Sequence, residues 1–106
     1  MTALINVPPL ALSGDVIEIK VMLQHPMETG FRPLAMGGTA PRDIVKTLRC
    51  SYLGEQVIEI ELHPAVTANP FFAFFLRVGD ETGDLVFDWE DEQGNTWTQA
   101  ATLNVG

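Results

Sequence analysis

The sequence predicts an all-β fold, an immunoglobulin-like two-sheet antiparallel β-sandwich of about seven strands that residues 1–106 form as a single domain. Apolar and polar side chains alternate with period two along most of the chain. Gly, Pro, Asn and Asp interrupt this alternation at short intervals, and no segment combines a sustained helical period with capping signals at both ends. A closed barrel usually needs more strands, so these observations favour a sandwich.

The expected strands are short and follow one another along almost the whole chain. In the second, Ile17, Ile19 and Val21 share one face, while Glu18 and Lys20 lie on the other, so this strand has a core side and a solvent side. Glycine-containing turns at residue 54 and at residues 93–95 predict two hairpins. The strands are expected at residues 3–7, 16–25, 44–53, 56–63, 71–78, 85–90 and 97–105.

One of these strands is apolar on both faces. Its two sets of side chains are Phe72, Phe74 and Leu76 on one side, and Phe71, Ala73 and Phe75 on the other. A domain of 106 residues has difficulty covering both faces, and exposed aromatic patches often mark protein interfaces. We therefore expect one of the two faces to meet a partner. The residues alone leave open which face it is, but the side with Phe71 and Phe75 is a contiguous aromatic surface.

The composition excludes some classes of partner. Fourteen acidic residues against six Lys and Arg give a net charge of -8, which repels phosphate backbones, so we expect no nucleic-acid partner. No apolar run approaches the roughly 20 residues that cross a bilayer, so we expect no membrane association. Residues 1–12 lack a basic start and contain two prolines where a signal peptide would be apolar, which predicts no export signal on this chain.

The residues that could support chemistry give weak signals. Cys50 shares a strand face with Leu48 and Tyr52, which predicts a buried, inert thiol, and the residues after it lack the ligands of a blue-copper site. His25 and His63 each precede a proline at a strand end and could approach each other, but two histidines alone make a poor metal site. We expect no catalytic residue, no cofactor and no bound metal.

Two charged segments have an ordinary and a functional interpretation. Arg32 and Arg42 lie in the long irregular stretch of residues 26–43, where guanidinium groups could bind a partner carboxylate, although loop salt bridges are about twice as frequent an outcome on general grounds. Acidic residues crowd the region of the last hairpin, and a solvated or docking face is favoured over calcium because no EF-hand spacing is present. These acids are Asp80, Glu81, Asp84, Asp88, Glu90, Asp91 and Glu92.

Several ordered motifs resemble those of the SoxZ family. They are HPMETG at residues 25–30, PRDI at residues 41–44, CSYLGE at residues 50–55, LHPAVTANP at residues 62–70 and the strand of residues 83–89. The resemblance covers nearly the whole chain. It implies an immunoglobulin-like, non-catalytic subunit of the SoxYZ sulfur carrier, which pairs with a SoxY subunit whose C-terminal cysteine arm holds the sulfur intermediates of thiosulfate oxidation.

The resemblance also implies a location and further partners. The chain ends without a cysteine arm, which agrees with the non-carrying subunit, and it would reach the periplasm by export with its partner. Other Sox enzymes would dock transiently on the pair. The alternative is a free-standing immunoglobulin-like module that binds a ligand or a protein. The residues expected at the partner interface are Met27, Glu28, Phe31, Arg32, Arg42, Phe71 and Phe75.

Overall fold

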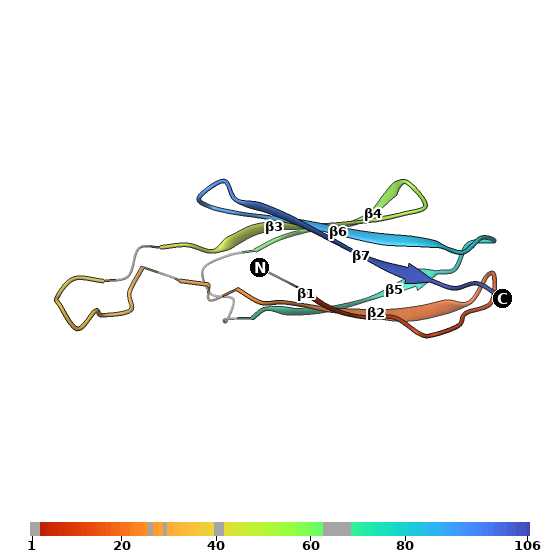
Figure 1. Cartoon of the computed structure of the whole chain (residues 1–106), viewed down its shortest axis with the longest axis horizontal. Helices are drawn as coiled ribbons and strands as arrows, with labels where there is room; N and C mark the ends of the chain where they lie inside the picture. The colour runs from red at the N-terminus through yellow and green to blue at the C-terminus, as the bar shows by residue number, and fades with distance from the viewer. Residues whose placement is uncertain (1–2, 26, 29, 40–41, 63–68) are drawn as a thin grey trace.

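The computed structural model describes residues 3–25, 27–28, 30–39, 42–62 and 69–106, and these form seven strands (Figure 1). Within this part of the chain, no helix is long and apolar enough to span a membrane. The strands are β1 (Ala3–Asn6), β2 (Val16–Leu23), β3 (Val45–Tyr52), β4 (Glu55–Glu61), β5 (Phe71–Arg77), β6 (Gly83–Asp91) and β7 (Thr96–Leu103).

The strands are arranged as two antiparallel sheets that lie one above the other (Figure 1). The smaller sheet has the order β1-β2-β5, and the larger has the order β4-β3-β6-β7. The β3–β4 and β6–β7 hairpins occur where the sequence predicts them. The predicted all-β sandwich is confirmed, and the strand ends differ from those expected by only a few residues.

The core lies between the two sheets and consists of the inward-facing set of each strand. On β6, Leu85, Phe87 and Trp89 are fully buried, whereas the alternate residues are only partly buried. Ile19 and Leu23 approach from β2 in the opposite sheet. Because successive side chains of a strand point to opposite faces, the period-two pattern of the sequence decides which half of each strand meets this core.

The segment between β2 and β3 projects beyond one end of the sandwich (Figure 1). Its tip is a small reversal in which Pro33 and Thr39 form a bridge and the amide of Leu34 donates to the carbonyl of Gly38. Gly37 and Gly38 have φ of 90° and 78°, a left-handed conformation that glycine adopts without a steric penalty. This projecting loop, residues 30–39, lies at one end of the longest dimension of the molecule, which measures 57 Å (Figure 1).

Removal of a core ring is expected to cost far more than removal of an outward ring. Phe87→Ala deletes a fully buried side chain and should lower the free energy of unfolding by about 3–5 kcal/mol, because it leaves a cavity between the sheets. Phe75→Ala, at a side chain that is 71% exposed, should change it by less than about 0.5 kcal/mol. Urea unfolding followed by tryptophan fluorescence measures both values, and equal losses would contradict the described core.

Candidate functional site

Three of the motifs singled out in the sequence meet at the end of the sandwich from which the loop projects. The amide of His25 donates to Oδ1 of Asn69 (3.1 Å), and the amide of Asn69 donates to the carbonyl of His25 (2.7 Å). Glu28 and Asp43 exchange both backbone hydrogen bonds, each 2.8 Å long. These bonds join the segment after β2 to the segments that precede β3 and β5, so the motifs build this end of the molecule together.

A buried polar cluster lies at the centre of this end and consists of His25, Asp43 and Asp91. Nε2 of His25 lies 3.8 Å from Oδ2 of Asp43 and 4.0 Å from Oδ2 of Asp91. His25 and Asp91 are fully buried, and Asp43 is partly buried. His25 lies just after β2, Asp43 lies just before β3, and Asp91 is the last residue of β6, so the cluster connects the two sheets.

The hydrogen bonds of His25 define which ring nitrogen carries the proton. The amide of Met27 donates to Nδ1 of His25 over 2.9 Å, so Nδ1 uses its lone pair as an acceptor. A neutral ring in this arrangement carries its proton on Nε2, which faces the two carboxylates. The candidate ligand atoms of the cluster lie within 4.8 Å of one another, a spacing that a metal ion could use. A metal bound to Nε2 would move the proton of the neutral ring to Nδ1, and Nδ1 could then no longer accept the amide of Met27. The geometry therefore favours a structural cluster over a metal centre.

Asp91 is held by the turn that follows β6. Its Oδ1 accepts the amides of Gln93 (3.0 Å) and Asn95 (2.9 Å), and its Oδ2 accepts the side-chain amide of Asn95 (3.2 Å). These bonds give both oxygens of the buried Asp91 side chain hydrogen-bond partners. Burial, followed by the nearby charge of Asp91, raises the pKa of the Asp43 carboxyl, and Oδ1 of Asp43 has no hydrogen-bond partner among the described residues.

The expected interface residues of the loop region divide into three groups. Arg32 pairs with Glu28 (2.9 Å) and Arg42 pairs with Glu92 (2.8 Å), so both arginines form the ordinary loop salt bridges that were the more frequent expectation. Met27 is buried, and its sulfur accepts the amide of Val45 at 3.3 Å, so it presents no surface to a partner. Phe31, in contrast, is 83% exposed. The other histidine that the sequence analysis considered as a metal ligand, His63, lies outside the described residues.

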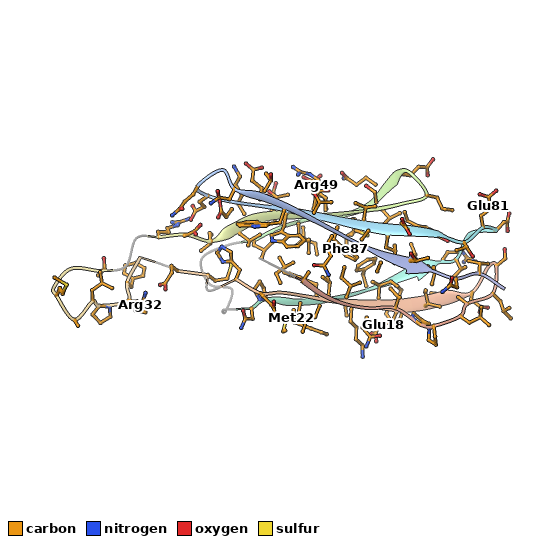
Figure 2. All side chains as sticks on the ribbon, in the orientation of Figure 1. Glu18, Met22, Arg32, Arg49, Glu81 and Phe87 are labelled. Carbon is orange, nitrogen blue, oxygen red and sulfur yellow. The ribbon has the colours of Figure 1, made fainter. Side chains whose placement is uncertain are left out.

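The loop tip adds an exposed residue that the sequence analysis did not single out. Met36 is fully exposed, and Leu34 beside it is also exposed. Together with Phe31 they give the projecting loop three uncovered apolar side chains. Figure 2 labels Arg32 of the same loop, which lies beyond the end of the sandwich. Several exposed apolar residues in one loop indicate a contact surface. These residues are visible in the sequence, so this signal could have been found there.

The two faces of β5 behave as the alternation predicts. Leu76 is buried and Phe72 and Phe74 are partly buried against the core, whereas Phe71 and Phe75 are 59% and 71% exposed. On the outer face the register places Met22 opposite Phe71. Leu4 of β1 lies opposite Met22 and is also exposed. We call the surface formed by Leu4, Met22, Phe71, Ala73 and Phe75 the outer aromatic face. Figure 2 labels Met22 and Glu18 on this sheet.

Cys50 is enclosed in the core, as the sequence predicts. Its side chain is fully buried on β3, on the same face as Leu48 and Tyr52. Burial, with a smaller contribution from the charge of Asp88, raises the pKa of the Cys50 thiol to about 12. The thiolate is the reactive form of cysteine, so this thiol is suited to packing and not to sulfur transfer at neutral pH.

The acidic residues around the last hairpin do not form one patch. Asp88 pairs with Arg49, and Glu90 pairs with Lys46, on the solvent side of the larger sheet. Asp91 points inward to the polar cluster. Most of these charges therefore belong to a solvated face, as expected, while Asp91 has a structural role that its position in an acidic run does not reveal.

Comparison with known proteins assigns the family. The family model for the sulphur oxidation protein SoxZ matches residues 5–102. The chain belongs to the SoxZ family. No curated protein sequence gives a match. The expectation drawn from the motifs is confirmed, and the SoxZ assignment makes the chain a subunit of a Sox system.

Solved structures share the fold of this SoxZ chain at low sequence identity. A superoxide reductase (neelaredoxin) from Ignicoccus hospitalis is 15% identical with a TM-score of 0.76, over 100% of this chain and 81% of that protein. The sulfur carrier protein SoxY from Chlorobium limicola f thiosulfatophilum is 14% identical with a TM-score of 0.70, over 98% of this chain and 78% of that protein. At these identities the likeness concerns the sandwich fold itself.

The Cys50 thiol should resist modification in the folded protein. With its pKa raised to about 12, the thiol stays protonated at pH 8, and the sheets exclude the reagent. Iodoacetamide at pH 8 should label it rapidly in urea and hardly at all without urea, as mass spectrometry would show. Rapid labelling of the native chain would contradict the description of the core.

The Asp43 carboxyl predicts a pH-dependent stability difference. A carboxyl whose pKa is raised by folding lowers stability when it is charged, that is above its folded pKa. Asp43→Asn should therefore raise the melting temperature at pH 7, and the gain should vanish as the pH falls below the ordinary value of 3.8.

Asp91→Asn is the matched control for this measurement. It weakens the bonds to the amides of Gln93 and Asn95, so it should lower the melting temperature at pH 7. Thermal unfolding followed by circular dichroism from pH 3.5 to pH 7 measures both variants. A gain for Asp43→Asn that does not depend on pH would contradict the role of its charge.

Proposed function

We propose that this chain is the non-catalytic scaffold subunit of a heterodimeric SoxYZ sulfur carrier in bacterial thiosulfate oxidation. The match of the SoxZ family model to residues 5–102 is the observation that carries this proposal. The partner is a SoxY-type subunit whose C-terminal cysteine arm holds the sulfur intermediates. The pair acts in the periplasm, which this chain reaches by export with its partner, and other Sox enzymes dock on the pair transiently.

The state of the single cysteine supports a non-carrying role. Covalent transfer of sulfur needs an accessible thiolate, and Cys50 is enclosed between the sheets with a raised pKa. Among the described residues, His25 is the only histidine. Its Nδ1 accepts the amide of Met27, and its Nε2 faces the carboxylates of the buried polar cluster. The part of the chain that the structure describes thus offers neither a sulfur acceptor nor an activated nucleophile, which supports a partner that carries the chemistry.

The exposed apolar surfaces support a protein partner. Phe71 and Phe75 lie on the outer aromatic face, and Phe31 and Met36 lie on the projecting loop. Aromatic and methionine side chains are enriched in interface cores, where burial of their large apolar surface stabilises the complex. Arg32 and Arg42 already have carboxylate partners, so apolar burial is the main contribution that this surface offers.

Co-expression with the SoxY-type subunit of the same organism tests the proposal. The two chains should co-purify as a stable one-to-one complex, and this chain alone should show no turnover with thiosulfate. A chain that stays monodisperse and unbound in the presence of the partner would contradict the proposal and would support a free-standing binding module.

Substitution of Phe75 should weaken the pair without weakening the fold. If the ring is an anchor, Phe75→Ser should cost roughly 2 kcal/mol or more of association free energy, about a 30-fold rise in Kd. Phe71→Ser should behave in the same way. The melting temperature of the lone chain should change little, because both rings are exposed.

The control is Val57→Ser on β4 of the larger sheet, which is also exposed and should leave the affinity unchanged. Isothermal titration calorimetry measures the affinity and differential scanning fluorimetry the stability. Unchanged affinity with a large loss of stability in the phenylalanine variants would assign the rings to the fold.

A further inference from the structure

The two sheets have four edge strands, and three of them carry a recognisable protection against pairing. β1 is only four residues long. β4 carries three glutamates in seven residues. β7 is tied to β1, because the side chain of Gln99 binds both the amide (2.9 Å) and the carbonyl (2.7 Å) of Ala3. Short length, charge and cover are the usual means by which proteins keep a sheet edge from adding another strand.

The fourth edge strand, β5, lacks each of these features. It has seven residues, and its first charge is Arg77 at the end. No described strand lies on its outer side, since the sheet order ends at β5. A long, apolar and uncharged edge is unusual in a protein that remains monomeric, because it is a template for strand addition. The sequence of β5 is therefore typical of an edge strand that another strand covers when the protein is functional.

The register shows which backbone groups point outward from this edge. The amide of Leu23 donates to the carbonyl of Pro70, just beyond the Met22–Phe71 pair, which makes that pair a non-hydrogen-bonded one. The hydrogen-bonded positions of β5 are then Phe72, Phe74 and Leu76. Because the two directions alternate along a strand, the amides and carbonyls of the other positions face away from β2. These positions are Phe71, Ala73 and Phe75.

We propose that the free edge of β5 pairs with an edge strand of the SoxY-type partner, so that the smaller sheet continues across the two subunits. This inference rests on the proposed function and specifies its interface. A SoxY protein shares this sandwich fold over 98% of the chain, and a protein with this fold has sheet edges of its own. The main-chain hydrogen bonds between β5 and the partner strand align the two subunits. Phe71 and Phe75 then lie beside this pair of strands on the outer face of the sheet.

This arrangement gives the backbone and the side chains separate roles. Main-chain hydrogen bonds along Phe71, Ala73 and Phe75 supply register and orientation. The two rings supply apolar burial, for which Met22 and Leu4 extend the same face. Loss of a ring and loss of a backbone donor should therefore weaken the complex independently.

Amide hydrogen exchange with and without the purified SoxY-type partner tests the ladder. In the lone chain, the amides of Phe72 and Phe74 should exchange slowly, and those of Ala73 and Phe75 should exchange fast. In the complex, the latter two should slow by at least about tenfold, because each gains a hydrogen-bonded partner. Exchange at Ala73 and Phe75 that stays fast in a stable complex would overturn the strand pairing and leave the proposed function intact.

Ala73→Pro provides the matched mutational test. It removes one outward amide and no bond to β2, a position at which an edge strand tolerates proline. Affinity for the partner should fall about tenfold or more, whereas Ala73→Val, which keeps the amide, should bind normally. Equal affinity of both variants with native exchange would overturn the inference.

Two further outcomes distinguish other occupants. If the unmodified chain forms no complex with the partner at all, both the proposed function and the strand pairing are overturned. If Ala73 and Phe75 are already protected in the lone chain, and dilution removes that protection, a second copy of this chain occupies the edge and the pairing with SoxY is overturned.

Discussion

The fold depends on the packing of two sheets through one face of each strand. Leu85, Phe87 and Trp89 of β6 meet the inward side chains of β2 and β5, and this contact excludes water from the centre of the molecule. A sandwich of this kind buries only one side of each sheet. Because β5 is apolar on both sides, its second set of rings remains exposed however well the core is packed. An incomplete surface is thus a consequence of the strand sequence.

The buried polar cluster complements this apolar core at the end of the sandwich. His25, Asp43 and Asp91 join the ends of three strands from both sheets, where irregular backbone enters and leaves the core. Buried polar groups are costly unless they are paired, so the cluster permits only an arrangement in which these segments lie together. The projecting loop emerges directly from this end, which anchors its base while its apolar tip is left uncovered.

Local alternation was sufficient to predict the strands, the two faces of β5 and the burial of Cys50, because each depends on side-chain period within one strand. The polar cluster could not be predicted, since its three residues are far apart in the sequence and meet only through the strand topology. Asp91 illustrates the difficulty. The alternation along β6 points its side chain inward, but the approach of His25 follows only from the strand topology. The pairing of Arg32 with Glu28 was within reach as a local spacing, whereas the pairing of Arg42 with Glu92 and the burial of Met27 required the tertiary structure.

The central claim is that this SoxZ-family chain is the subunit of a sulfur carrier that binds no sulfur intermediate covalently, because its only thiol is enclosed between the sheets. Intact-mass spectrometry of the pair, isolated without reductant after incubation with thiosulfate and the other Sox enzymes, tests this claim most directly. The account predicts sulfur adducts on the SoxY-type partner and an unchanged mass for this chain. A sulfur adduct on Cys50 would contradict it.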